Sequence, residues 1–298
     1  MEFEEEENTN AKYPNLISHE CSKKILGQME KDVCKIKIGD EQGTGFFCKI
    51  PFPDRNETLL NEFNLRYDLD IEGTTIENLD LSYKYLGNKG LEDLSKIEFK
   101  ELKQLNLGDN NISDINALEK AKFEKLEILG LGYNGLSDID ILEKVNFKEL
   151  KQLDLYGNNI SDIKALEKAK FEKLEILGLG NNGLSDVGVL EKVNFKELKK
   201  LDLYSNDISD ISVLEKVGFK KLEILNLDEN NISNIDVLAR VNFKNLIQLN
   251  LSFNNISDIK VLENVKFEKL EKLDLDNNKI SDITKLERVN FKDLKEVF

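Results

Sequence analysis

One histidine and three cysteines are the first residues of this chain to consider for catalysis or metal binding. His19 is the only histidine in 298 residues, and Cys21, Cys34 and Cys48 all lie near the N-terminus. A zinc site needs about four clustered ligands, and neither the cysteine spacing nor a single histidine supplies such a set. We therefore predict no metal and no cofactor. The odd number of cysteines fits reduced thiols, and His19 is expected on the surface of a helix.

A further candidate for chemistry is Gly-Thr-Gly-Phe-Phe, residues 43–47, which is similar to the strand before the catalytic histidine in trypsin-like serine proteases. That resemblance implies a histidine soon afterwards and a later Gly-Asp-Ser-Gly segment. Here Pro51, Phe52 and Pro53 follow, and no such serine segment occurs. An activated serine needs a neighbouring base, so we predict a protein that is not an enzyme. Two interpretations stay open: a decayed, catalytically dead trypsin-like protease, or a strand that only caps the next domain.

Charge and hydrophobicity argue against several classes of partner. The net charge is −15, and the chain opens on MEFEEEEN. Phosphates repel such a field, so nucleic acids and anionic membranes are disfavoured. The sequence has no run of 18 apolar residues and no apolar leader near its N-terminus, which predicts a cytoplasmic protein. Residues 1–13 are expected to form an acidic disordered tail.

The elements that must position any functional side chain come from a repeat that starts at Ile76. The pattern L-x-x-L-x-L-x-x-N returns every 24 residues from Leu102 to Leu270, after a first copy of 26 residues, and a stub starts at Leu294. Residues 102–149 match residues 150–197 at 40 of 48 positions, so the unit of duplication is two repeats. Repeats of this length predict a stacked array.

Each repeat contains the signals for a strand, a turn and a short helix. The leucines alternate with outward residues, which predicts a short β-strand. In the repeat at residues 150–173, Ser161 and Asp162 suit a helix N-cap, and Ile163, Leu166 and Ala169 then fall at helical spacing. The asparagine after each strand is expected to satisfy backbone groups of its own and adjacent coils. This asparagine ladder comprises Asn110, Asn134, Asn158, Asn182, Asn206, Asn230, Asn254 and Asn278.

A phenylalanine closes each repeat and predicts a buried phenylalanine column. Its members are Phe99, Phe123, Phe147, Phe171, Phe195, Phe219, Phe243, Phe267 and Phe291. One unit cannot bury these faces alone, so the coils must stack, with a parallel sheet on the concave face and short helices on the convex face. The chain resembles leucine-rich repeat proteins over residues 76–298. Its ISDI segments resemble the short-repeat branch that includes bacterial internalins and the leucine-rich regulator of protein phosphatase 1.

We therefore predict an α/β leucine-rich repeat solenoid of nine repeats and a stub over residues 76–298. Residues 14–75 are expected to cap it with a helix, at 14–33, and a β-hairpin. At the other end, Leu273, Leu275 and Phe291 are expected to be exposed on the open side of the last coil. Self-association through that uncapped C-terminal edge is one consequence.

The outward strand positions supply the candidate partner-binding residues. Aromatic and aliphatic side chains there resemble the anchors of protein interfaces, and glycines beside tyrosines are expected to leave room for a protruding group. The candidates are Tyr133, Tyr156, Tyr204, Phe253, Ile128, Ile176, Ile224, Asp154, Asp202, Asp228 and Asp274. Acidic residues in the later repeats favour a basic partner.

The predicted function is protein–protein interaction through the concave face, without catalysis. A regulatory subunit that binds an enzyme such as a protein phosphatase is an alternative. A face without a partner, whose pattern only echoes the duplication, is another.

Overall fold

The computed structural model describes residues 54–289 and 291–298, which form a single unit. The expected acidic tail, the helix at 14–33, the hairpin and the protease-like strand lie outside the described residues. So do His19 and the three cysteines. The fold and its consequences therefore concern the repeat region and the segment directly before it.

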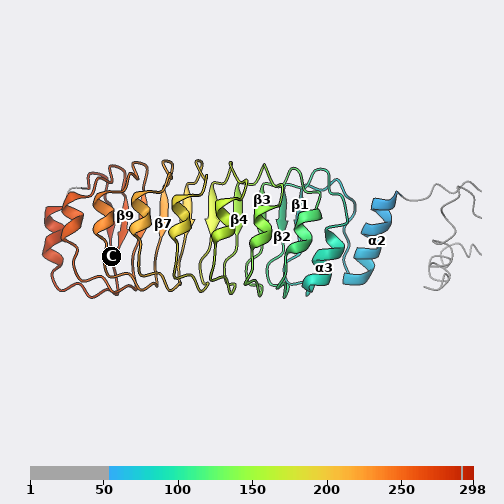
Figure 1. Cartoon of the computed structure of the whole chain (residues 1–298), viewed down its shortest axis with the longest axis horizontal. Helices are drawn as coiled ribbons and strands as arrows, with labels where there is room; N and C mark the ends of the chain where they lie inside the picture. The colour runs from blue at the N-terminus through green and yellow to red at the C-terminus, as the bar shows by residue number, and fades with distance from the viewer. Residues whose placement is uncertain (1–53, 290) are drawn as a thin grey trace, which may run out of the picture. The chain divides into compact units, whose positions relative to one another are not determined.

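Ten short parallel strands form one sheet in chain order (Figure 1). Their bounds are β1 (Asn78–Asp80), β2 (Gln104–Asn106), β3 (Ile128–Gly130), β4 (Gln152–Asp154), β5 (Ile176–Gly178), β6 (Lys200–Asp202), β7 (Ile224–Asn226), β8 (Gln248–Asn250), β9 (Lys272–Asp274) and β10 (Glu296–Val297). The central leucines stay in register, as where Leu153 faces Leu129 and Leu177. Each repeat position therefore forms a column across the sheet, and the predicted solenoid is confirmed.

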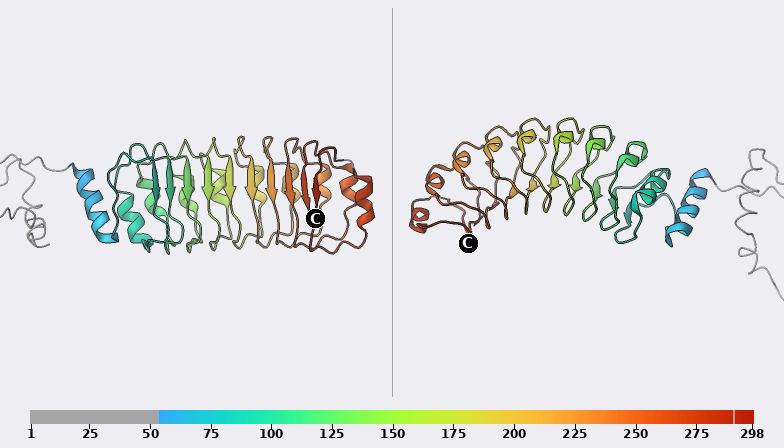
Figure 2. Two further views of the ribbon diagram at one scale, coloured as in Figure 1. Left: turned by 180° about the vertical axis from the view of Figure 1, so that it is seen from behind. Right: turned by 60° about the horizontal axis from the view of Figure 1, so that its bottom comes forward.

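Short helices lie on the outer side of the arch, and the strands line its inner, concave side (Figure 2). The first repeat carries an α-helix, α3 (Gly87–Leu94). The others carry 3₁₀ turns: η3 (Asn116–Lys120), η4 (Asp140–Glu143), η5 (Lys164–Glu167), η6 (Gly188–Glu191), η7 (Ser212–Glu215), η8 (Asp236–Ala239), η9 (Lys260–Asn264) and η10 (Ile283–Arg288). A 24-residue coil must return to the next strand quickly, so most of these turns contain only four residues, and such short segments favour 3₁₀ geometry.

The start of each 3₁₀ turn agrees only in part with the N-cap predicted from the sequence. The Asp162 carboxylate accepts a hydrogen bond from the Lys164 backbone N–H at 2.8 Å, whereas the residue directly before the turn is Ile163. Ile163 and Leu166 point into the core, where each is at most 1 % exposed. The aspartate thus sets the turn and the aliphatic residues anchor it to the sheet.

The core is a layer of leucines behind the strands and a column of phenylalanines beside them. Leu150, Leu153 and Leu155 are fully buried. All nine phenylalanines of the column are buried, and the ring centroids of Phe99 and Phe123 lie 6.3 Å apart. Because each ring packs on the next coil, no coil has a complete core of its own.

An α-helix, α2 (Arg55–Tyr67), covers the first coil, where the sequence had indicated only a lead-in to the repeats. Its Leu60 and Phe63 are buried. Asn56 fixes its start: its side-chain amide donates to the Glu98 carbonyl at 2.8 Å and accepts from the Glu98 N–H at 2.7 Å. Asp54 acts as the N-cap. The helix therefore protects the leucines of the first repeat from water.

At the last coils, the expected exposure of Leu273, Leu275 and Phe291 is wrong. Their exposed fractions are 0, 3 and 9 %. The stub itself covers them, since β10 pairs with β9 and the Leu275 N–H donates to the Phe298 carbonyl at 3.0 Å. Within the described parts of the chain, no helix is both long and apolar enough to cross a membrane.

Candidate binding face

The asparagine ladder fixes the turn that follows each strand. The Asn158 side-chain amide donates to the carbonyls of Leu131, at 3.1 Å, and Leu155, at 2.9 Å. Its oxygen accepts from the N–H groups of Asn134, at 3.2 Å, and Leu136, at 3.1 Å. One side chain thus satisfies backbone groups in two coils. The loops at this edge of the concave face are held by these bonds before any partner arrives.

The residue just before each ladder asparagine has a left-handed backbone. It is a glycine in only one coil, Gly157, with φ +66°. Tyr133 (φ 52°), Glu229 (φ 53°) and Phe253 (φ 47°) adopt the same conformation, which costs an L-residue about 1–2 kcal/mol. Tyr133 is 55 % exposed and Phe253 is 57 % exposed. The strained positions therefore hold aromatic rings out at the edge of the sheet, where bulky residues are uncommon.

Three tyrosines form a continuous aromatic band, which we define as Tyr133, Tyr156 and Tyr204. The centroids of Tyr133 and Tyr156 lie 5.1 Å apart in an edge-on arrangement. Tyr156 and Tyr204 come from coils two apart, yet their rings are parallel, with centroids at 6.2 Å. The coil between them carries Gly180, which allows the Tyr156 ring to lean across it. The band is a pre-formed surface that the strand pattern alone does not indicate.

The glycines beside these tyrosines do not leave the room that the sequence suggested. A Cβ on Gly157 would lie 2.7 Å from Cδ1 of Tyr133, and a Cβ on Gly180 would lie 2.9 Å from Cδ2 of Tyr156. The tyrosine rings themselves occupy the space above both glycines. The sequence pattern showed glycines beside tyrosines, but we expected the space above the glycines to be open to a partner.

A different part of the face is hollow. A groove of about 340 Å³ crosses β1 to β4. Ile128, Gly130 and Asp154 line it together with the amides of Gln104 and Gln152. The other two candidate isoleucines, Ile176 and Ile224, are likewise half-buried and lie opposite Lys200 and other polar strand residues. The candidates thus divide between a polar groove at the early strands and the aromatic band beyond it.

A row of alternating charges runs beside the strands. It comprises Glu77, Lys103, Glu127, Lys151, Glu175 and Lys199, and we call it the first charge row. Ion pairs join neighbouring coils: Lys151 contacts Glu127 at 2.7 Å, and Lys199 contacts Glu175 at 2.7 Å. Exposed pairs of this kind contribute little stability one by one. They do neutralise one another along this row.

The later coils leave acidic groups uncompensated. Asp202 has Lys200 at 3.6 Å and accepts a hydrogen bond from Asn226 at 3.1 Å. Among the described residues, Asp228 and Asp274 have no ion-pair partner. Burial raises the pKa of Asp228 above its ordinary value. The charge of Asp274 adds to this rise, because the two carboxylates of the later coils repel one another.

Two tyrosines of the band hold their protons tightly. Burial, followed by hydrogen bonding to Tyr133, raises the pKa of Tyr156 to about 12. Hydrogen bonding to the nearby Glu229 carboxylate, followed by the negative charge of that group, raises the pKa of Tyr204. Tyr156 and Tyr204 therefore stay neutral at physiological pH and present uncharged rings next to carboxylates.

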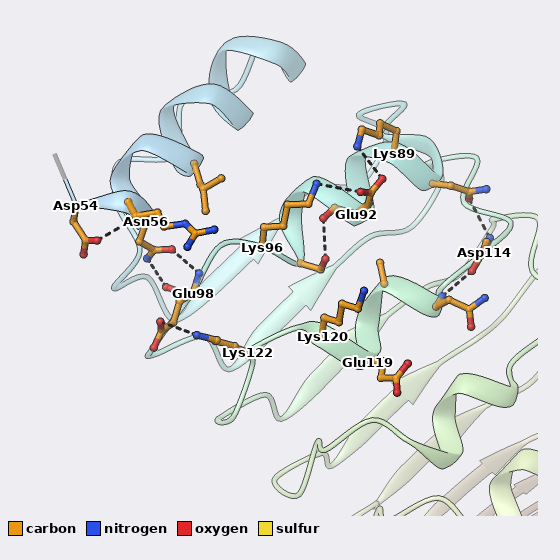
Figure 3. A pocket seen from close by; sticks show the side chains of 16 residues that line it. Asp54, Asn56, Lys89, Glu92, Lys96, Glu98, Asp114, Glu119, Lys120 and Lys122 are labelled. Carbon is orange, nitrogen blue, oxygen red and sulfur yellow. Dashed lines mark hydrogen bonds and ion pairs between the residues drawn. The ribbon is translucent and has the colours of Figure 1, made fainter. Parts of the chain in front are cut away.

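A larger hollow lies away from this face, between α2, α3 and η3, with a volume of about 950 Å³ (Figure 3). Part of its charged lining forms ion pairs. Lys89 and Lys96 both contact Glu92, at 2.8 and 3.1 Å, and Lys122 lies 3.5 Å from Glu98. No group of three or more metal-ligating side chains occurs in the described ranges.

Comparison with known proteins decides the family. The family described as Leucine Rich repeats (2 copies) matches residues 124–168, 148–192, 172–216, 196–240 and 244–288, which together exceed half of the chain. The chain is a leucine-rich repeat protein. A comparison with curated proteins gave no match.

Solved leucine-rich repeat structures support the fold. An internalin, InlF, from Listeria monocytogenes is 22 % identical, with 83 % of this chain and 95 % of that one covered and a TM-score of 0.51. Internalin C2 of the same organism is 23 % identical, with 83 % and 93 % covered and a TM-score of 0.51. At these identities the likeness concerns the fold alone.

A plant relative is slightly closer in sequence. The leucine-rich ectodomain of the receptor kinase GASSHO1/SCHENGEN3 from Arabidopsis thaliana is 27 % identical, with a TM-score of 0.53. The match covers 71 % of this chain and 25 % of that one. That structure is a complex with Casparian strip integrity factor 2. The resemblance to leucine-rich repeat proteins inferred from the motif is confirmed.

Proposed function

We propose that this leucine-rich repeat protein binds a protein partner through its concave sheet and catalyses no reaction. The observation that carries the proposal is the aromatic band on a sheet whose edge loops are fixed by the asparagine ladder. A pre-formed surface loses little conformational entropy when a partner docks. Exposed aromatic rings are among the usual anchors of protein interfaces.

The acidic later coils support a basic partner. Like charges across an interface repel, and complementary charges speed association and fix orientation. The plant receptor ectodomain was solved with a bound partner, which supports a similar use of this array. The isoleucines and Asp154 in the early groove would then contact the same partner beyond its main anchors.

The test is affinity capture from a lysate of the source organism, read by mass spectrometry. One bait is the native chain, and the second carries Tyr156→Ala, Tyr204→Ala and Asp202→Lys. A control bait carries Lys168→Ala and Lys192→Ala on the convex side, where both lysines are exposed. Circular dichroism checks that all three baits are folded.

We expect a protein that the native and control baits capture and the concave-face bait loses. Retention of every specific partner by the concave-face bait would place binding elsewhere and overturn the proposal. Loss from the control bait alone would have the same meaning.

A further inference from the structure

On the concave face, two carboxylates that form no ion pair in the described ranges lie between two aromatic side chains. This arrangement indicates a more specific kind of contact with a partner. Asp228 and Glu229 are consecutive, and they follow β7. Tyr204 occupies the position of Asp228 in the preceding coil, and Phe253 occupies the position of Glu229 in the following coil. Backbone bonds keep these coils adjacent: the Ser205 N–H donates to the Asp228 carbonyl at 2.9 Å, and the Glu229 N–H donates to the Ser252 carbonyl at 3.1 Å.

The carboxylates of the first charge row are compensated, unlike this pair. Along the first charge row, carboxylates meet a lysine of a neighbouring coil, as Glu127 meets Lys151 and Glu175 meets Lys199, each at 2.7 Å. Within the described ranges, Asp228 and Glu229 take part in no ion pair. The nearby lysines of the face are engaged elsewhere: Lys200 with Asp202 at 3.6 Å, and Lys272 with Glu296 at 2.8 Å.

One of the two carboxylates is held in place by a hydroxyl group, because the Ser252 hydroxyl donates to Asp228 at 2.8 Å. The Glu229 carboxylate lies near the Tyr204 hydroxyl, whose pKa it raises. Asp228 is half-buried, whereas Glu229 is exposed. A cation that reached both groups would be partly removed from water and would lie beside the rings of Tyr204 and Phe253. Phe253 is 57 % exposed and has its ring free for such a contact.

We propose that Asp228 and Glu229, flanked by Tyr204 and Phe253, receive an arginine side chain of the protein partner. The inference rests on the proposed function, because it names the anchor through which that partner docks. A guanidinium offers two parallel N–H groups to carboxylates and a flat face to aromatic rings. It is also less strongly hydrated than an ammonium group, which favours it at a half-buried site. A lysine side chain supplies the positive charge, but its ammonium group has no flat face to place between the rings.

The test uses two fluorescein-labelled probes of equal charge, Gly-Ser-Arg-Gly-Arg-Ser-Gly and its counterpart with both arginines replaced by lysine. Fluorescence anisotropy measures their binding to the full chain at fixed ionic strength. The site variant carries Asp228→Asn and Glu229→Gln. The matched control carries Glu127→Gln and Glu175→Gln, which removes the same charge from the first charge row. A third variant, Tyr204→Leu with Phe253→Leu, removes the rings without changing charge.

We expect the native chain and the control to bind the arginine probe about fivefold more tightly than the lysine probe, as one cation–π contact allows. The site variant should lose most of its affinity for both probes. The ring variant should bind both probes equally. Equal binding of the two probes to the native chain, or equal losses in the site variant and the matched control, would show only general electrostatic attraction and overturn the inference.

The outcome is separable from that of the proposed function. If lysate capture depends on the concave face but the probes are not distinguished, the face binds a partner by other groups and only the arginine anchor is wrong. If the probes are distinguished but no partner depends on the face, the anchor exists and the proposed function fails.

Discussion

Each asparagine of the ladder is important to this fold, because its side chain satisfies backbone groups in two coils at once. Asn158 replaces the water that the carbonyls of Leu131 and Leu155 would otherwise need. The leucines that face the core exclude water from this edge, so removal of the amide leaves those groups without partners. Its neighbour Asn159 is exposed and offers a comparison of the same residue type.

The substitution Asn158→Ala should lower the free energy of unfolding by about 1–3 kcal/mol, the range for buried polar groups left unpaired. Asn159→Ala should change it by less than about 0.5 kcal/mol, as is usual for surface positions. Urea denaturation followed by circular dichroism measures both. Equal effects of the two substitutions would contradict the role of the ladder.

Tyr156 makes the band sensitive to alkaline pH. Its pKa in the folded chain is about 12, whereas an unfolded tyrosine titrates near pH 10. The folded state therefore holds this proton more tightly. The stabilising contribution is complete below about pH 10 and is lost as the pH rises toward about 12.

Absorbance at 295 nm should show this difference. When the titration of Tyr156→Phe is subtracted from that of the native chain, the remaining curve should have its midpoint near 12 rather than near 10. Circular dichroism at each pH identifies the range in which both proteins stay folded. A midpoint near 10 within that range would mean that the Tyr156 ring is solvated and does not lean across Gly180.

At the scale of elements, the strands and the phenylalanine column provide most of the contacts that hold the stacked coils together. Phe171 is 1 % exposed, whereas Lys170 beside it is exposed. Phe171→Ala should destabilise the array by about 3–5 kcal/mol, the range for a large aromatic residue removed from a core. Lys170→Ala should leave stability almost unchanged. Chemical denaturation tests the pair, and a small loss in both would mean that the column relaxes around the missing ring.

The elements also show what the sequence could and could not predict. The strands, the leucine register and the column follow from spacing, because one repeated period specifies all of them. The α2 helix was not predicted, although Leu60 and Phe63 lie at helical spacing. The lean of Tyr156 depends on the missing side chain of Gly180 in the next coil, and a single repeat contains no information about it.

At the scale of the whole molecule, the two-repeat period produces alternating charge. A second charge row, Glu101, Lys125, Glu149, Lys173, Glu197 and Lys221, repeats the pattern of the first. Lys125 contacts Glu101 at 2.6 Å, and Lys221 contacts Glu197. Opposite charges meet only if coils are added or removed in pairs. This parity gives a physical reason for a duplication unit of two repeats.

Two deletion variants distinguish the effect of removing an odd or even number of coils from the effect of shortening the array. Removal of residues 126–173, two coils, places Lys103 beside Glu175 and Lys125 beside Glu197, so both rows still alternate. Removal of residues 150–173, one coil, places Glu127 beside Glu175 and Glu149 beside Glu197. Each like-charge contact should destabilise the shorter deletion by about 0.2–0.5 kcal/mol at low salt. This destabilisation adds to the stability that is lost with the coil itself.

Salt distinguishes this repulsion from the other consequences of losing a coil, such as the removal of Tyr156. Screening weakens interactions between exposed charges, with a Debye length of about 10 Å at 0.1 M and about 3 Å at 1 M. Raising the salt concentration should therefore stabilise the one-coil deletion relative to the two-coil deletion. The substitutions Glu127→Gln and Glu149→Gln in the one-coil deletion should abolish that difference. If salt shifts the urea midpoints of both deletions equally, the charge rows do not select paired coils, and the 48-residue period reflects the history of duplication alone.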